Sequence, residues 1–415
     1  MDGPSPAVAK YYLYQAADSV GFIWPVFTLF LLWNDLSYTQ IGTLSAISAV
    51  LVVVFEVPTG HLADRFGRRN VLSLGMVAMA LSTAGFVVAG TFAAFVGLYV
   101  LWALSMALQH GTADAWLYAT LRERTDAEAF TRIRGRGGAV HQLVSVGTMV
   151  AGGLLYVAHP TYPFVASAVL NAVGAGVVLT MPRNAAVEDD VVGFREAVGV
   201  VRSQLADASL RVFLPYVALF FAIVSVADTY VQPITVEVLG SVSPPSALAS
   251  ATRGTAVPPP VTLGVMYAGF ALVAAVASYH AETVRAWLGL RRALLVLPVL
   301  TAALFVAPLA VPLAAVPVFF VMKGANDLSR PLVGQYLNDR TDEAGRATVL
   351  SAASMVYAFV RAPLKPLAGL LADATAPVVT VGALGVGFLL VAAALLVSTV
   401  PVEAETGGLA GERAD

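Results

Sequence analysis

Long apolar runs recur along the whole chain, and their length limits the folds that it can adopt. A run of about 20 apolar residues is long enough to cross a bilayer as a helix. Runs of about this length, which short polar segments separate, lie at about 11–32, 38–58, 71–89, 92–118, 138–158, 163–181, 211–237, 262–282, 293–311, 314–336, 348–371 and 377–399. We therefore expect an all-α membrane protein with twelve transmembrane helices, arranged as two pseudo-symmetric six-helix halves.

The composition excludes a soluble enzyme. The chain has 415 residues, of which 58% are hydrophobic and only 12% are charged, whereas about 25% of the residues in average soluble chains are charged. The absence of cysteine excludes disulfides, thiol catalysis and cysteine-ligated metals. The five histidines are scattered without the spacing of metal ligands. We expect no enzyme activity, no cofactor and no metal.

The apolar runs divide the chain into segments. We expect an N-terminal half at 1–182, a cytoplasmic central loop at 183–209, a C-terminal half at 210–400 and a cytoplasmic tail at 401–415. The central loop carries an apolar helical face, which predicts a helix lying on the membrane surface. That face consists of Val191, Phe194, Val198, Val201 and Leu205. The loop at about 239–261 is rich in Ser, Pro and Ala, and we expect it to be dispensable.

Lysine and arginine predict the orientation, because the short cytoplasmic loops of membrane proteins carry an excess of both. With the N-terminus inside, Arg253 is the one basic residue in an outer loop, and both termini are expected to be cytoplasmic. The inner segments then include Arg65, Arg68, Arg69, Arg122, Arg124, Arg132, Arg134, Arg136, Arg183, Arg195, Arg202, Arg211, Arg285, Arg291 and Arg292.

A short charged stretch joins the second and third runs, with the sequence Gly60-His61-Leu62-Ala63-Asp64-Arg65-Phe66-Gly67-Arg68-Arg69. Because this number of charges would be costly in hydrocarbon, we expect the loop to face water. Gly60 and Gly67 fit a sharp turn of the backbone. The stretch closely resembles the signature G-x-L-A-D-R-x-G-R-R, which lies between helices 2 and 3 in the major facilitator superfamily.

That resemblance implies a monomeric transporter in the cytoplasmic membrane of a prokaryote. Its substrate site would lie at the middle of the membrane, between two halves that rock against each other. It also implies that the loop controls gating, with Asp64 interacting with the start of helix 11. The gating residues expected on this basis are Gly60, Asp64, Arg65, Gly67, Arg68 and Arg69.

An internal repeat supports the resemblance. Gly111-Thr-Ala-Asp114 in the fourth run matches Gly324-Ala-Asn-Asp327 in the tenth. The segment Arg124-Thr125-Asp126 matches Arg340-Thr341-Asp342 in the same order. Two six-helix halves related by a parallel repeat are typical of this family.

Four aspartates lie within apolar runs, and each is costly there unless it faces water or a partner. They are Asp18, Asp114, Asp228 and Asp327, in helices 1, 4, 7 and 10. In the family these helices line the central cavity. A carboxyl group in such a cavity can load and release a proton near neutral pH. Asp18 and Asp114 are the favoured proton carriers, and the alternative is that the aspartates hold helices together by hydrogen bonds.

Further residues are candidates for the proton and substrate cavity, namely His110, Arg361, Lys365, Tyr14 and Trp116. His110 either shares a proton with Asp114 or, as we favour, is a packing residue. Arg361 and Lys365 either reach the interface, or clamp an anionic substrate, or balance the charge of Asp228. For Asp327, we favour local pairing with Lys323 or Arg330.

Many members of the family are drug/proton antiporters, and this sequence departs from their pattern at two places. The departures weaken an assignment of the chain to that group. Ala107 stands where they carry an arginine, and Ala151-Gly152 stands where they carry Gly-Pro. Glu56, just before the loop, is interpreted as a partner of the loop arginines. We expect a proton-coupled exporter of a small solute that interacts with protons and the lipid bilayer and binds no nucleic acid. The alternatives are proton-linked uptake or facilitated diffusion of a small organic solute, and a non-transporting receptor with the same fold.

Overall fold

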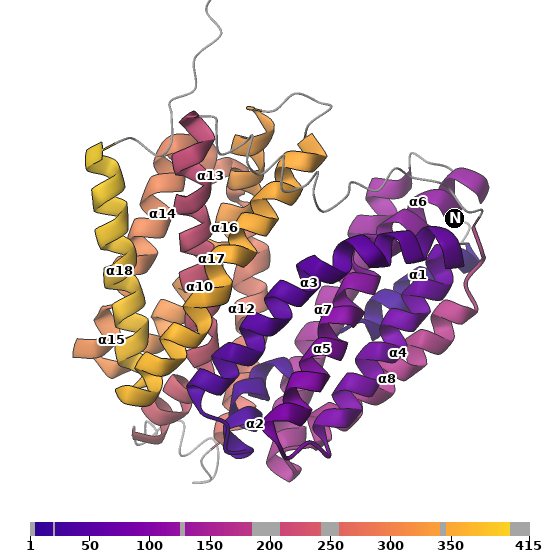
Figure 1. Ribbon diagram of the computed structural model, residues 1–415, viewed down its shortest axis with the longest axis horizontal. Helices are drawn as coiled ribbons and strands as arrows, with labels where there is room; N and C mark the ends of the chain where they lie inside the picture. Colours follow the sequence, from indigo (N-terminus) through magenta and orange to yellow (C-terminus); the bar gives the residue numbers. More distant parts are fainter. Residues whose placement is uncertain are drawn as a thin grey trace, which may run out of the picture. The chain divides into compact units, whose positions relative to one another are not determined.

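The computed structural model describes residues 5–19, 21–124, 129–184, 208–241, 257–340 and 346–398 (Figure 1). Every regular element in these ranges is helical. The first part of the chain forms α1 (Pro6–Ala17), η1 (Trp24–Val26), α2 (Phe27–Trp33), α3 (Tyr38–Phe66), α4 (Arg68–Phe86), α5 (Phe92–Gln109), α6 (Thr112–Arg124), α7 (Phe130–Ala158) and α8 (Tyr162–Leu179). The second part forms α10 (Ala208–Ser241), α12 (Pro259–Tyr279), α13 (Ala281–Leu288), α14 (Leu290–Leu304), α15 (Ala307–Ala310), η3 (Pro312–Ala314), α16 (Ala315–Asn338), α17 (Arg346–Ala374) and α18 (Pro377–Ser398).

Within the described ranges, nine helical segments are long and apolar enough to cross a membrane. They are Tyr38–Glu56, Phe92–Glu123, Phe130–Ala158, Tyr162–Leu179, Leu210–Gly240, Pro259–Tyr279, Leu290–Ala310, Ala353–Ala374 and Pro377–Leu395. The other three predicted spans correspond to α1 with α2, to α4 and to α16. The all-α membrane fold is therefore confirmed, and the described helices are consistent with twelve spans.

Three predictions fall on parts of the chain outside the described residues. They concern the helix of the central loop, for which the structure omits 185–207, the loop at 239–261, for which it omits 242–256, and the tail, for which it omits 399–415. All three remain predictions.

The chain forms two compact units that do not coincide with the two sequence halves. Unit 1 comprises 1–196, 225–272 and 361–380, and unit 2 comprises 197–224, 273–360 and 381–415. Within unit 1, α4 packs against α5 and α8, and α3 packs against α5. Unit 1 therefore contains the whole N-terminal bundle together with pieces of α10, α12, α17 and α18.

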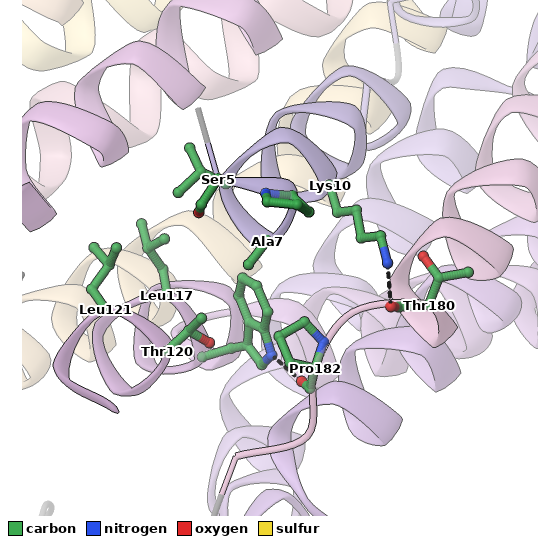
Figure 2. Close-up of a pocket in the computed structure, with 11 residues that line it drawn as sticks. Ser5, Ala7, Lys10, Leu117, Thr120, Leu121, Thr180 and Pro182 are labelled. Carbon is green, nitrogen blue, oxygen red and sulfur yellow. Dashed lines mark hydrogen bonds between the residues drawn. The ribbon is translucent and has the colours of Figure 1, made fainter. Parts of the chain in front are cut away.

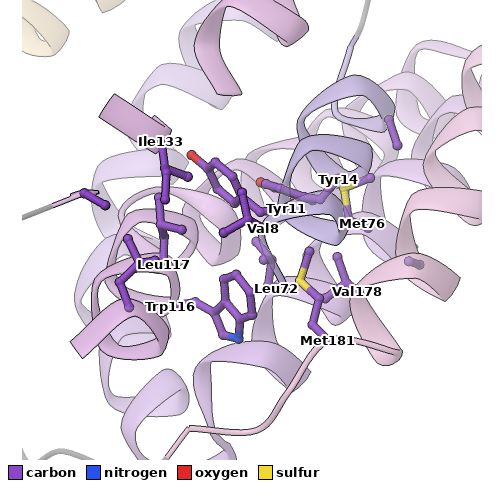
Figure 3. Close-up of a cluster of buried hydrophobic side chains, with 14 residues drawn as sticks. Val8, Tyr11, Tyr14, Leu72, Met76, Trp116, Leu117, Ile133, Val178 and Met181 are labelled. Carbon is purple, nitrogen blue, oxygen red and sulfur yellow. The ribbon is translucent and has the colours of Figure 1, made fainter. Parts of the chain in front are cut away.

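A buried cluster joins α1 to α4, α6, α7 and α8 (Figure 3). Tyr11 stacks on Trp116 with ring centroids 6.5 Å apart, and both side chains are fully buried. The Trp116 indole N–H donates to the carbonyl of Pro182 at 3.0 Å. Because a buried aromatic side chain removes about 150–250 Å² from water, these two rings are a large part of the contact between α1 and α6. Trp116, which was considered as a cavity residue, thus lies in this core.

The charged signature is mostly helical. Helix α3 continues through Phe66, Gly67 alone forms the turn with φ of +85°, and α4 begins at Arg68. The expectation for Gly67 is confirmed, since only glycine adopts this φ without strain. The expectation that Gly60 also forms the turn is wrong, because Gly60 lies inside α3, where its backbone is helical.

The arginines after this turn bind backbone carbonyls. Arg68 donates to the carbonyl of Ala115 at 3.2 Å, and Arg69 donates to those of Leu179 and Met181 at 3.2 and 3.3 Å. The last carbonyls of a helix have no partner within it, so a cation at the end of α8 is favourable there. These bonds connect the start of α4 to α6 and to the end of α8.

Candidate functional site

Two helices of the N-terminal bundle are interrupted in the middle of predicted spans. Helix α1 ends at Ala17, Asp18 follows it, and the next helical element begins at Trp24. Helix α5 ends at Gln109, His110 is extended, and α6 begins at Thr112. Sequence reasoning treated 11–32 and 92–118 as continuous runs. Neither run is continuous. In the second, Gly111 has φ of +73°, which ends a right-handed helix.

A hydrogen bond joins the two interruptions. The Tyr14 hydroxyl donates to Gln109 Oε1 at 3.3 Å, and Tyr14 is 2% exposed. Tyr14 lies one turn before Asp18, and Gln109 directly precedes His110. Asp18 is half-buried, and within the described residues its carboxylate has no hydrogen bond or ion pair. Interrupted helices that face each other near the midplane are where many transporters bind substrates and coupling ions.

His110 pairs with Glu56 of α3, and its exposure shows that the packing role favoured from the sequence is wrong. The Nδ1 atom of His110 lies 3.4 Å from Glu56 Oε1, and the two side chains are 76% and 49% exposed. The interpretation of Glu56 as a partner of the loop arginines does not match this arrangement. The pair lies at the interruption between α5 and α6. Because Glu56 is exposed, its carboxylate is accessible to a further binding partner.

Asp114 forms an ion pair with Arg134 of α7. Both Nε and Nη2 of Arg134 contact Asp114 Oδ2, at 2.9 and 2.8 Å. Asp114 also lies in the first turn of α6, where the helix dipole favours a negative charge. The two side chains are 40% and 58% exposed. Because charged groups in hydrocarbon are costly, this exposure indicates that the pair faces water.

The candidates from the second half of the chain divide between the two units. In unit 1, Lys365 of α17 lies within electrostatic range of Arg361 and Asp228. For Lys365, this agrees with the interpretation as a countercharge for Asp228, and the role of Arg361 stays a prediction. In unit 2, Arg330 Nε lies 3.6 Å from Asp327 Oδ1, one helical turn away, which is the local pairing that sequence reasoning favoured.

A cavity of about 350 Å³ is lined by none of these charged residues (Figure 2). It is bounded by the first turns of α1, by α6 and by the segment after α8. Lys10 is its one charged lining residue, and its Nζ atom donates to the carbonyl of Thr180 at 2.7 Å. Since it contains none of the predicted site residues except the core side chain Trp116, we place the candidate site at the helix interruptions instead.

Sequence reasoning missed the residues that hold this site together. Glu56, Gln109 and Arg134 were not expected to pair with His110, Tyr14 and Asp114. The signal was the triplet Gln109-His110-Gly111, which places two polar residues and a helix-ending glycine inside an apolar run. The partner of Asp114 had no local signal, because Arg134 is 20 positions away on another helix.

Comparison with known proteins decides the family. The family model described as Major Facilitator Superfamily matches residues 16–362. The chain belongs to the Major Facilitator Superfamily. Over 99 residues it is 29% identical to the "Uncharacterized MFS-type transporter YxaM" of Bacillus subtilis (strain 168). That match covers 24% of this chain and 25% of the relative, so it spans a quarter of the relative's length.

Solved structures show the same superfamily fold. The nucleoside transporter NupG is 10% identical, with a TM-score of 0.77 over 94% of this chain and 97% of NupG. A bacterial homolog of the human lysosomal transporter Spinster, inward-facing and occupied, is 15% identical, with a TM-score of 0.69 over 95% of this chain and 97% of that one. The superfamily and these structures are transporters and not enzymes. The resemblance seen in the sequence is confirmed.

Replacing Gly111 by alanine is expected to strain the interruption between α5 and α6. A side chain at positive φ costs about 1–2 kcal/mol, and the space around Gly111 is open, so the strain comes from the backbone alone. The thermal unfolding midpoint of the purified protein should fall. The control is Gly97→Ala within α5, where the space is also open and φ is helical. An equal or higher midpoint for Gly111→Ala would contradict the assignment.

Proposed function

We propose that this superfamily member is a secondary active transporter that moves a small solute by alternating access, coupled to protons, in the direction of export. The observation that carries the coupling is Asp18, a half-buried carboxylate at a helix interruption, with no ion pair within the described residues. A carboxylate that has no cation beside it can be neutralised by a proton at low cost, whereas a paired one must first lose its partner.

Two exposed charge pairs near the second interruption support a water-accessible site. The His110–Glu56 and Asp114–Arg134 pairs are both exposed, and the Tyr14–Gln109 bond joins the two interrupted helices. Charged residues in membrane spans mark ion and substrate pathways. We assign the proton to Asp18 and Asp114 and the solute to the space beside them, with Asp228, Arg361 and Lys365 as candidates from the other half.

The proposed setting is the cytoplasmic membrane of a prokaryote, with a monomeric chain and both termini in the cytoplasm. The bias of arginines toward the signature end of the spans supports this orientation. Export is proposed because it is common among members of the superfamily, although Ala107 and Ala151 depart from the pattern of its drug/proton antiporters.

A thermal-shift screen of purified protein against a diverse solute library tests substrate binding, because a ligand of the folded state raises its stability. Solutes that bind are then tested for flux in proteoliposomes with and without a proton gradient. Gradient-driven accumulation is the expected result. Binding without any flux would instead favour a receptor with this fold, and flux that never exceeds equilibration would favour facilitated diffusion.

Uptake is the second candidate, and the departures at Ala107 and Ala151 from the superfamily's drug/proton exporters favour it. Vesicles of defined orientation separate the two directions. Solute should accumulate in inside-out vesicles when the protein exports, and in right-side-out vesicles when it takes solute up.

Asp64→Asn is expected to slow transport and to leave solute affinity within a few-fold of wild type. Asp64 lies in the last turn of α3, at the signature end and about two turns after Glu56. A residue placed there acts on the conformational equilibrium rather than on the solute. The measurements are flux and binding, with Asp35→Asn, in the turn before α3, as the control. Lost binding with a normal interconversion rate would contradict this role.

A further inference from the structure

The N-terminus of α3 is completed by a residue from the other half of the sequence. The backbone N–H groups of Tyr38 and Thr39 donate to Oδ1 and Oδ2 of Asp373 at 2.8 and 2.9 Å, and the Thr39 hydroxyl donates to Oδ2 at 2.6 Å. Asp373 lies at the end of α17, 335 positions from Tyr38, and all these residues belong to unit 1. We call these three hydrogen bonds the Asp373 cap.

The local sequence leaves these two N–H groups without a partner. The first N–H groups of a helix have no acceptor within it. Ser37 and Gln40 form a capping box, in which each side chain accepts from the other residue's backbone N–H. The box cannot reach the N–H groups of Tyr38 and Thr39. Asp373 therefore binds the donors that α3 cannot satisfy alone, and its negative charge lies at the positive end of the helix dipole.

Two glycines allow the backbones of α3 and α17 to approach closely beside the cap. A Cβ atom at Gly369, one turn before Asp373, would lie 2.7 Å from the Thr39 nitrogen. A Cβ atom at Gly42, one turn after Tyr38, would lie 2.7 Å from the Lys365 carbonyl carbon. Small residues at such crossings let membrane helices pack backbone to backbone. This contact requires glycine on both helices.

A second side chain from the C-terminal half acts in the same way on α2. Gln232 of α10 accepts from the backbone N–H groups of Thr28 and Leu29 at 2.8 and 3.2 Å, and it donates to the carbonyl of Trp24 at 2.9 Å. Gln232 is buried, whereas Asp373 is exposed. Water can replace the bonds of an exposed group at little net cost, but not those of a buried one. The Asp373 cap is thus the part of this contact that can open and close most readily.

We propose that Asp373 is a conformational switch residue, which holds the α3 N-terminal end against α17 in one state of the transport cycle and releases it in the other. The proposal rests on the proposed function in one respect, since alternating access requires the two halves to separate at this end, opposite the signature. In this mechanism the Asp373 carboxylate, from the C-terminal half, accepts hydrogen bonds from the N-terminus of α3 in one state and from water in the other.

The test measures a distance across this contact in the full-length protein. The chain has no cysteine, so Gly90→Cys and Val379→Cys introduce the only two spin-label sites. Gly90 lies in the turn between α4 and α5, Val379 lies in the first turn of α18, and both are exposed. Pulsed electron paramagnetic resonance in lipid nanodiscs should give a distribution dominated by one short distance. Asp373→Ala should move a large part of it to longer distances, and Asp373→Asn, which keeps one acceptor oxygen, should have a smaller effect.

Matched variants make the result decisive. Gly42→Ala adds a methyl group at the backbone contact and should shift the distribution in the same direction as Asp373→Ala, even if the latter folds poorly. Gly97→Ala and Thr375→Ala should leave it unchanged, because a methyl group at Gly97 meets open space and the Thr375 hydroxyl donates to the carbonyl of Leu371 one turn before it. Unchanged distances in Asp373→Ala and Gly42→Ala would overturn the proposal. The measurement uses neither solute nor gradient, so a protein that carries out no transport would refute the proposed function without deciding this one.

Discussion

Asp18→Asn is expected to abolish solute accumulation against a gradient while preserving equilibrium exchange of the solute. An amide imitates the protonated carboxyl group and cannot release a proton, so the cycle still runs but no longer moves charge with the solute. A transmembrane potential of 100 mV contributes about 2.3 kcal/mol for each charge that crosses it. Loss of the titrating group removes that contribution, together with the contribution of the pH gradient.

Both fluxes are measured in proteoliposomes between pH 5.5 and 8.5. Wild-type accumulation should depend on pH, whereas exchange by Asp18→Asn should be nearly independent of it. Asp339→Asn is the control, since this exposed aspartate ends α16 and lies in no predicted cavity. If Asp18→Asn still accumulates solute with the wild-type pH dependence, the proton uses another group or the protein is uncoupled.

The membrane fold could be predicted from the sequence because the length of an apolar run is a local property that the sequence shows directly. Runs of apolar residues predicted the spans, and the signature with Gly67 predicted the turn before α4. The errors arose where one residue changes the local backbone. Gly111 takes a positive φ inside an apolar run, and no periodicity shows which glycines will do so.

The candidate site was predictable only in part. Its carboxylates were found because an aspartate in an apolar run is conspicuous and costly. Their partners were not found, because the approach of α7 to α6 sets the Arg134–Asp114 contact, and the approach of α3 to the end of α5 sets the Glu56–His110 contact. Asp373 was invisible for the same reason, since its partners are backbone N–H groups with no sequence signal.

Asp114→Asn is expected to abolish accumulation and to reduce exchange several-fold. Unlike Asp18, Asp114 has a direct partner, and its removal leaves the Arg134 guanidinium without its carboxylate. Exposed ion pairs contribute about 0.2–1 kcal/mol, and this pair is 40% and 58% exposed. About 1 kcal/mol on the transport barrier corresponds to an effect of roughly fivefold on the rate.

The double variant Asp114→Asn with Arg134→Gln separates the two roles of this pair. Removing both charges eliminates the unpaired guanidinium, so folding and exchange should recover toward the wild-type level. Accumulation should remain absent, because we propose that a proton on Asp114 releases Arg134 during the cycle and the double variant has no group to protonate. Arg134→Gln alone is the matched single variant, measured in the same proteoliposomes. Recovery of accumulation in the double variant would show that the pair only holds α6 against α7, and would leave Asp18 as the one coupling residue of the N-terminal half.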